Sequence, residues 1–228
     1  MVFSVTLNFR GGKSLTKKTN LVLIFDKQSM EGMYDVYSPV AWKVTAFPAG
    51  GGGSFKATYT ADIAFTRAQI SGDVVEDASY STHINVQEET TLTITDPDPP
   101  ATYAFSKPER WASAQPGQFQ CHNKTGGYQD IGVGFYVPGH HDPVTALVVN
   151  KNPGGSVVVT FTPILSAYVV TGSWQKGKVI QHHIHSKLDW NLDLTWLPKH
   201  TNWILEESGA GYTLEIDDPP DLEAESDD

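Results

Sequence analysis

Residues 3–9, Phe-Ser-Val-Thr-Leu-Asn-Phe, alternate apolar and polar side chains without a break. Residues 55–65, Phe-Lys-Ala-Thr-Tyr-Thr-Ala-Asp-Ile-Ala-Phe, again place an apolar residue at every second position. A period of two is typical of a strand with one buried face. Residues 21–25, Leu-Val-Leu-Ile-Phe, are continuously apolar instead, which predicts a strand buried on both faces.

Short strand-like segments continue along the chain and are separated by turn residues such as Gly50 to Gly53 and Asn152-Pro153-Gly154-Gly155. This pattern predicts an all-β chain, an antiparallel β-sandwich of about ten to twelve strands. Residues 178–185 are expected to form one of those strands. One or two short C-terminal helices are expected within residues 187–207, where Pro198 must interrupt any helix.

The chain has 228 residues and a net charge of −10, but the charge is unevenly distributed. Residues 215–228 hold eight acidic and no basic residues, which leaves 18 acidic against 16 basic residues in 1–214. We therefore expect a single domain over 1–214 and a disordered acidic tail over 215–228. A nearly neutral body without a basic stripe argues against a nucleic-acid partner.

Cys121 is the single cysteine, so no internal disulfide can form. The first residues lack the pattern of a signal peptide, and no apolar run is long enough to cross a bilayer. These features predict a cytoplasmic protein without a membrane partner. A homodimer is expected, because the edge strands of a sandwich must be paired or covered.

Residues 181–186, Gln-His-His-Ile-His-Ser, hold three of the eight histidines. On a strand, His183 and His185 would lie on one face, with His182 and Ile184 on the other. Two imidazoles on one face can hold a divalent metal ion, and the loop 139–143 could add His140 and Asp142 as further ligands. The alternative is that these are surface histidines without a ligand.

Aromatic side chains are the second candidate set. Trp174 follows Gly172-Ser173 in a turn, and Tyr136 and Trp190 could also cover the ring of a small ligand. The alternative for each is ordinary packing in the core or at its rim.

Motifs of known catalytic chemistry are missing from the sequence. Gly11-Gly12-Lys13-Ser14 lacks the first glycine of a phosphate-binding loop, since position 7 is Leu7. Cys121 and His122 are adjacent, so on a strand they would point to opposite faces and make no nucleophile pair. The prediction is accordingly a protein that is not an enzyme.

Four segments of the chain are similar to a set of small, signal-less proteins of mushroom-forming fungi. They are Pro-Val-Ala-Trp-Lys-Val at 39–44, Ala-Phe-Thr-Arg-Ala-Gln at 64–69, Thr-Gly-Gly-Tyr-Gln-Asp-Ile-Gly-Val-Gly-Phe at 125–135 and Phe-Thr-Pro-Ile-Leu-Ser-Ala-Tyr at 161–168. The resemblance covers residues 39 to 170 and includes a pigment-binding chromoprotein of oyster mushrooms. It implies a scaffold that holds a small chromophore non-covalently with the help of a metal, and it assigns no functional residue here.

The sequence thus predicts a non-enzymatic, cytoplasmic binding protein for a small aromatic molecule or pigment, with a non-covalent chromophore and a divalent metal ion as candidate cofactors. Two alternatives stay open: a fruiting-body lectin that stacks sugars on exposed tryptophans, and a histidine-ligated metalloenzyme.

Overall fold

The structure is a computed structural model that describes residues 2–25, 36–209 and 211–217. The chain is all-β, with 56% of it in strands and 1% helical. The predicted fold class is confirmed at this level. Within the described residues, no helix is long and apolar enough to cross a membrane.

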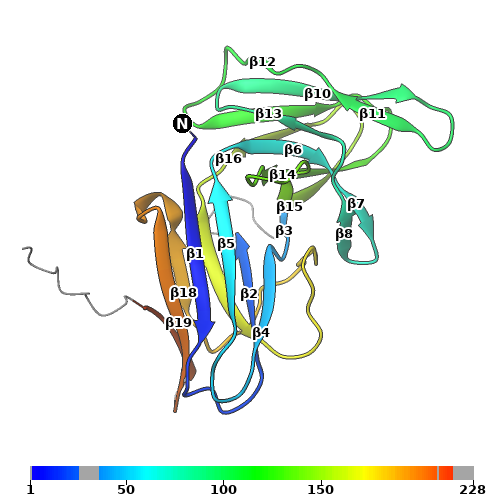
Figure 1. Cartoon of the computed structure of the whole chain (residues 1–228). Coiled ribbons are helices and arrows are strands. Elements are labelled where there is room, and N and C mark those ends of the chain that lie inside the picture. Colours follow the sequence, from blue (N-terminus) through cyan, green and yellow to red (C-terminus); the bar gives the residue numbers. More distant parts are fainter. Residues whose placement is uncertain (1, 26–35, 210, 218–228) are drawn as a thin grey trace, which may run out of the picture.

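One half of the molecule contains two four-stranded sheets, whose strands run vertically in Figure 1. The first sheet has, in order, β20 (Gly211–Ile216), β19 (His200–Ser208), β1 (Ser4–Gly11) and β5 (Ser54–Thr60). The second has β18 (Trp190–Asp193), β17 (Ile164–Val170), β2 (Thr19–Phe25) and β4 (Lys43–Phe47).

The other half, at the top of Figure 1, contains two five-stranded sheets and a small ribbon. One sheet has the order β11 (Thr102–Phe105), β10 (Glu88–Asp96), β13 (Gln118–Asn123) and β16 (Ser156–Thr160), and β12 (Glu109–Arg110) also pairs with β10. The other sheet has β3 (Ser38–Pro39), β15 (Val144–Lys151), β14 (Gln129–Phe135), β6 (Ile63–Arg67) and β9 (Ser81–His83). The ribbon pairs β7 (Gln69–Ser71) with β8 (Val74–Asp77).

The main hydrophobic core runs through both halves. The alternation of residues 3–9 appears in β1 as buried Val5, Leu7 and Phe9. At the junction of the halves, the Phe135 ring of β14 lies 4.9 Å from the Tyr59 ring and 5.7 Å from the Phe25 ring. These rings come from three different sheets, so they pack the two halves onto one continuous core.

The predicted single antiparallel sandwich of ten to twelve strands is not what the structure shows. The described residues form twenty strands in four larger sheets and one ribbon. Two neighbouring pairs, β1 with β19 and β10 with β13, are parallel. Parallel neighbours far apart in the chain leave no local turn signal, so periodicity could not reveal them.

The predicted C-terminal helices are wrong. In the described residues, the region 187–207 contains β18, a three-residue 3-10 turn at Leu194–Trp196 and most of β19. In β19 the side chains of Thr201, Trp203 and Leu205 are buried at alternate positions. That spacing is the period of a strand and not of a helix.

The acidic tail begins later than predicted. Glu215 and Ile216 belong to β20, and the Asp217 carboxylate accepts hydrogen bonds from the guanidinium of Arg10. The rest of the predicted tail, 218–228, lies outside the described residues.

A long connection, residues 171–189, covers the second face of the sheet that contains β2. The side chains of Ile180 and Ile184 pack there in a separate cluster with Val22 and Ile24 of β2. Leu21, Leu23 and Phe25 of the same strand face the main core. The prediction that residues 21–25 are buried on both faces is therefore confirmed.

Candidate functional site

The chain changes sheets at Ala61 and Asp62, within the run 55–65 that the sequence predicted as uninterrupted. Residues before this point form β5 in one half, and residues after it form β6 in the other. The Asp62 carbonyl accepts a hydrogen bond from the Tyr136 backbone N–H at 2.9 Å. The corner thereby places the Asp62 side chain beside the end of β14.

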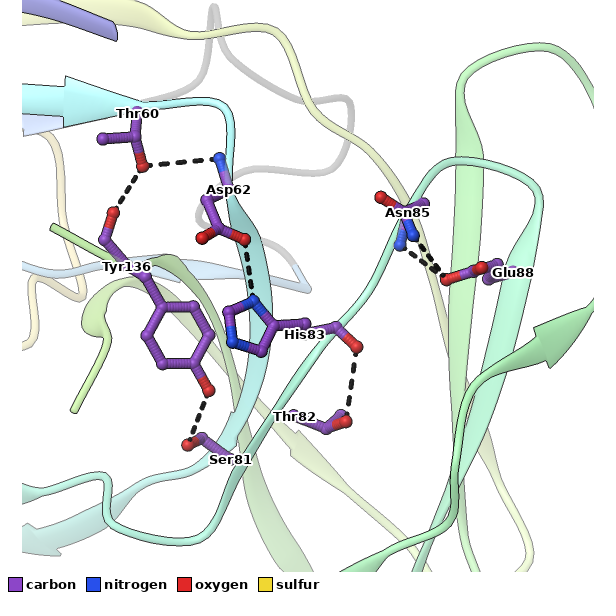
Figure 2. Close-up of polar contacts among 8 residues, drawn as sticks. All are labelled: Thr60, Asp62, Ser81, Thr82, His83, Asn85, Glu88 and Tyr136. Atoms are coloured by element: carbon purple, nitrogen blue, oxygen red, sulfur yellow. Dashed lines mark hydrogen bonds and ion pairs between the residues drawn. The ribbon is translucent and has the colours of Figure 1, made fainter. Parts of the chain in front are cut away.

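His83 and Tyr136 lie at this corner with their rings stacked (Figure 2), 3.9 Å between centroids and 17° between planes. The His83 Nδ1 lies 2.7 Å from Asp62 Oδ1. The Tyr136 hydroxyl lies 3.0 Å from the Ser81 Oγ. The backbone carbonyl of Tyr136 accepts a hydrogen bond from the Thr60 hydroxyl. Both rings are therefore held in place by groups from several strands.

Four residues of this corner, Thr60, Asp62, His83 and Tyr136, line a pocket of about 400 Å³, called here the Tyr136 pocket. Its other lining residues are Val2, Ser4, Val137, Pro138, Gly139, His140 and His141. The pocket thus combines three imidazoles and a phenol ring with apolar side chains. This volume lies within the range of small-ligand sites.

The hydrogen bond to Asp62 determines what His83 can offer a ligand. An ionised carboxylate can only accept, so the neutral His83 ring carries its hydrogen on Nδ1 and keeps a lone pair on Nε2. The His83 side chain is 64% exposed and the Asp62 side chain 36% exposed. In this neutral form the pair presents an oriented acceptor nitrogen and an aromatic ring to solvent.

The predicted strand over 178–185 is not formed. Only Lys178 and Val179 make isolated β-bridges, with Val74 and Val40. His183 and His185 still lie near each other, with ring centroids 6.1 Å apart, because the extended chain buries Ile184 between them. Both histidines are exposed.

Trp174 packs beside these histidines in a second pocket of about 270 Å³, called here the Trp174 pocket. The indole N–H donates to the Thr171 carbonyl at 3.1 Å, and the Lys178 Nζ lies 5.0 Å from the ring centroid. The indole is thus partly covered by its own turn, which accounts for an aromatic residue at this place.

The predicted metal set does not come together. His140 lines the Tyr136 pocket, whereas His183 and His185 line the Trp174 pocket. In the described ranges, no group of three or more His, Cys, Asp and Glu side chains could hold a metal ion. The loop 139–143, including exposed Asp142, brings its side chains to a different part of the surface, because β14 and β15 position it there.

The three predicted ligand-binding aromatics are also separated. Tyr136 and Trp174 lie in the two pockets above. Trp190 packs at the edge of the main core, with its ring centroid 5.1 Å from that of Trp203, and lines a third pocket that also contains His183.

Cys121 and His122 point to opposite sides of β13, as the sequence predicted. Cys121 is fully buried, and burial raises the pKa of its thiol to about 12. His122 lies on the other face, between the Ser156 Oγ at 2.7 Å and the Glu89 Oε2 at 3.1 Å. The thiol is therefore protonated at neutral pH and cannot act as a nucleophile there.

Asp62 and His83 were missed in the sequence. The available signal was local: aspartate is unfavourable inside a strand, so Asp62 marked a break in the run 55–65. No sequence pattern connects His83 to Asp62 across 21 residues, because antiparallel pairing of β9 with β6 creates that contact.

Comparison of the chain with protein-family models, with curated proteins and with solved structures finds no match.

Proposed function

We propose that the protein binds a small, planar aromatic molecule that carries a hydroxyl group, and that it does so in the Tyr136 pocket. The observation that carries this proposal is the His83 ring, which is stacked on Tyr136 and oriented by Asp62 at the wall of a 400 Å³ pocket.

The chemistry of the pocket matches this class of ligand. The exposed face of the His83 ring can stack on a second aromatic ring, and the side chains of Val2, Val137 and Pro138 supply apolar contacts. The Nε2 lone pair accepts a hydrogen bond from the ligand hydroxyl. Apolar side chains that contact the ring, together with polar groups that fix its orientation, are typical of small-molecule sites.

A matched pair of probes tests the proposal. 2-Naphthol has a planar ring and a hydroxyl, whereas 2-methoxynaphthalene has the same ring without the donor hydrogen. We expect saturable binding of 2-naphthol, followed by its fluorescence, and about fivefold weaker binding of the methoxy compound, because one neutral hydrogen bond is lost.

The variant His83→Ala should remove the preference for 2-naphthol, since the acceptor is gone. His182→Ala changes an exposed histidine outside the pocket and is the matched control. The proposal fails if neither probe binds saturably, or if His83→Ala leaves the preference unchanged. A visible spectrum of the purified protein and a glycan array test the pigment and lectin alternatives on the same preparation.

A further inference from the structure

A larger hollow, of about 640 Å³, lies on the other side of the connection 171–189 and is called here the lysine groove. Its walls are the start of β2, the end of β17, residues 185–187 and the β19–β20 hairpin. Four of its side chains are basic: Lys17, Lys18, His185 and Lys187.

The three lysines carry most of the charge of the groove. All three are exposed, and they take part in none of the ion pairs that the described part of the chain forms. Glu207 also lines the groove, but its Oε2 already accepts from the Thr16 N–H and hydroxyl, each at 2.7 Å. The backbone hydrogen bond from Thr16 first, then its hydroxyl and the charge of Lys17, lower the pKa of the Glu207 carboxyl. The ionised Glu207 therefore offsets part of the lysine charge. Three lysines against one carboxylate still leave the groove positive, whereas residues 1–214 as a whole hold 18 acidic against 16 basic residues.

The walls that carry these charges are held together. The Ser186 hydroxyl oxygen accepts hydrogen bonds from the backbone N–H groups of Val169 and Leu188, each at 3.0 Å. This anchors the residue between His185 and Lys187. The Asn20 side chain donates to the Gly172 carbonyl at 3.3 Å, which ties the opposite wall to β2.

The hairpin wall approaches closely through Gly211. A Cβ at position 211 would lie 2.7 Å from the Lys187 carbonyl oxygen, closer than side chains tolerate. Only glycine lets the β19–β20 turn pack directly against the backbone of Lys187. The groove is thus a built feature with fixed walls that bring lysines from two distant segments to one hollow.

We propose that the lysine groove binds a small ligand that carries two or more phosphate groups. Lysine ammonium groups bind phosphate as point charges, and three of them around one hollow match at least two such groups. The volume of the groove suits a ligand of this size. The site is separate from the Tyr136 pocket and shares none of its lining residues.

Titration calorimetry with inorganic pyrophosphate at low ionic strength tests this proposal. We expect saturable binding that weakens with added salt, because the contacts are charged and exposed. The double variant K17A/K187A should raise the Kd about tenfold or more, since hydrogen bonds to charged groups are lost. Orthophosphate, with one phosphate group, should bind more weakly than pyrophosphate.

The control is K56A/K107A, which removes two exposed lysines outside the groove and gives the same net charge. An unchanged Kd in this control supports a local site. Equal weakening in both double variants, or no saturable pyrophosphate binding, would overturn the proposal.

A second arm distinguishes the source of the phosphates. Phosphatidylcholine vesicles with and without phosphatidylinositol 4,5-bisphosphate are sedimented with the protein and with K17A/K187A. If the protein sediments with the bisphosphate lipid and K17A/K187A does not, the groove binds phosphates and its ligand is a lipid headgroup. If pyrophosphate binds but the protein does not sediment, the groove binds phosphates of a soluble ligand.

Discussion

Ile184 anchors the histidine-bearing connection, and its replacement by alanine is the sharpest test of how that connection is held. The side chain is 8% exposed and packs with Val22, Ile24, Tyr168 and Ile180 on the second face of the β2 sheet. The variant Ile184→Ala removes three carbon groups, each worth about 0.8 kcal/mol when buried. We expect the free energy of unfolding to fall by about 2 kcal/mol. This is at the lower end for truncations in a core, because an irregular connection can partly collapse into the space.

Equilibrium urea unfolding measures this loss, followed by tryptophan fluorescence, and limited proteolysis reports whether residues 171–189 open locally. His185→Ala is the matched control, since the neighbouring side chain is exposed and should cost under about 0.5 kcal/mol. If Ile184→Ala costs no more than His185→Ala and leaves proteolysis unchanged, the connection is not held by this cluster and the reasoning is refuted.

Three further predictions concern other parts of the structure. Cys121 should resist iodoacetamide at pH 8 in the folded protein and react only after unfolding in urea, because burial raises the pKa of its thiol to about 12. Rapid labelling of the native protein would contradict this. The hydrogen bond from His122, followed by that from Gln120, lowers the pKa of the Glu89 carboxyl below its ordinary 4.5. The ionised carboxylate therefore stabilises the fold above pH 4.5, and this stabilisation is lost as the pH falls through the pKa of the folded state. The variant His122→Ala should therefore show a shallower loss of unfolding free energy below pH 4.5, and an unchanged slope counts against the contact. Gly211→Ala should cost about 1–3 kcal/mol in urea unfolding, because the added Cβ meets the Lys187 carbonyl oxygen; a neutral substitution would show that the hairpin can move away.

The parts of the fold that follow from local pattern were predictable. The alternation in residues 3–9 corresponds to β1 with Val5, Leu7 and Phe9 buried, although Phe3 precedes the strand and is exposed. The apolar run 21–25 lies in β2 and is buried throughout. The sheet arrangement was not predictable in the same way. Parallel pairing of β1 with β19 joins residues almost 200 positions apart, and a single sequence carries no signal for such a pair.

The errors at 178–185 and 187–207 have a common physical origin. In both regions the hydrophobic spacing shows which side chains are buried. It does not show whether the backbone there forms the hydrogen bonds of a strand, of a helix or of neither. Ile180 and Ile184 are buried by a sheet that they do not join as a strand. Trp203 and Leu205 are buried because that face of β19 packs on the main core.

The candidate site was only partly predictable for a related reason. The sequence predicts Tyr136 as a ring-covering aromatic and His140 as a metal ligand, and both side chains line the Tyr136 pocket. Asp62 and His83, which give that pocket its oriented nitrogen, meet only because the chain crosses between two sheets at the corner. Tertiary geometry of this kind has no counterpart in residue spacing.

The central claim is that an aromatic hydroxyl ligand sits against His83 and Tyr136. Intermolecular nuclear Overhauser effects between bound 2-naphthol and assigned aromatic side-chain protons test it most directly. We expect contacts from the naphthol ring to the ring protons of His83 and Tyr136. Contacts to the indole of Trp174 instead, or none to His83, would contradict it.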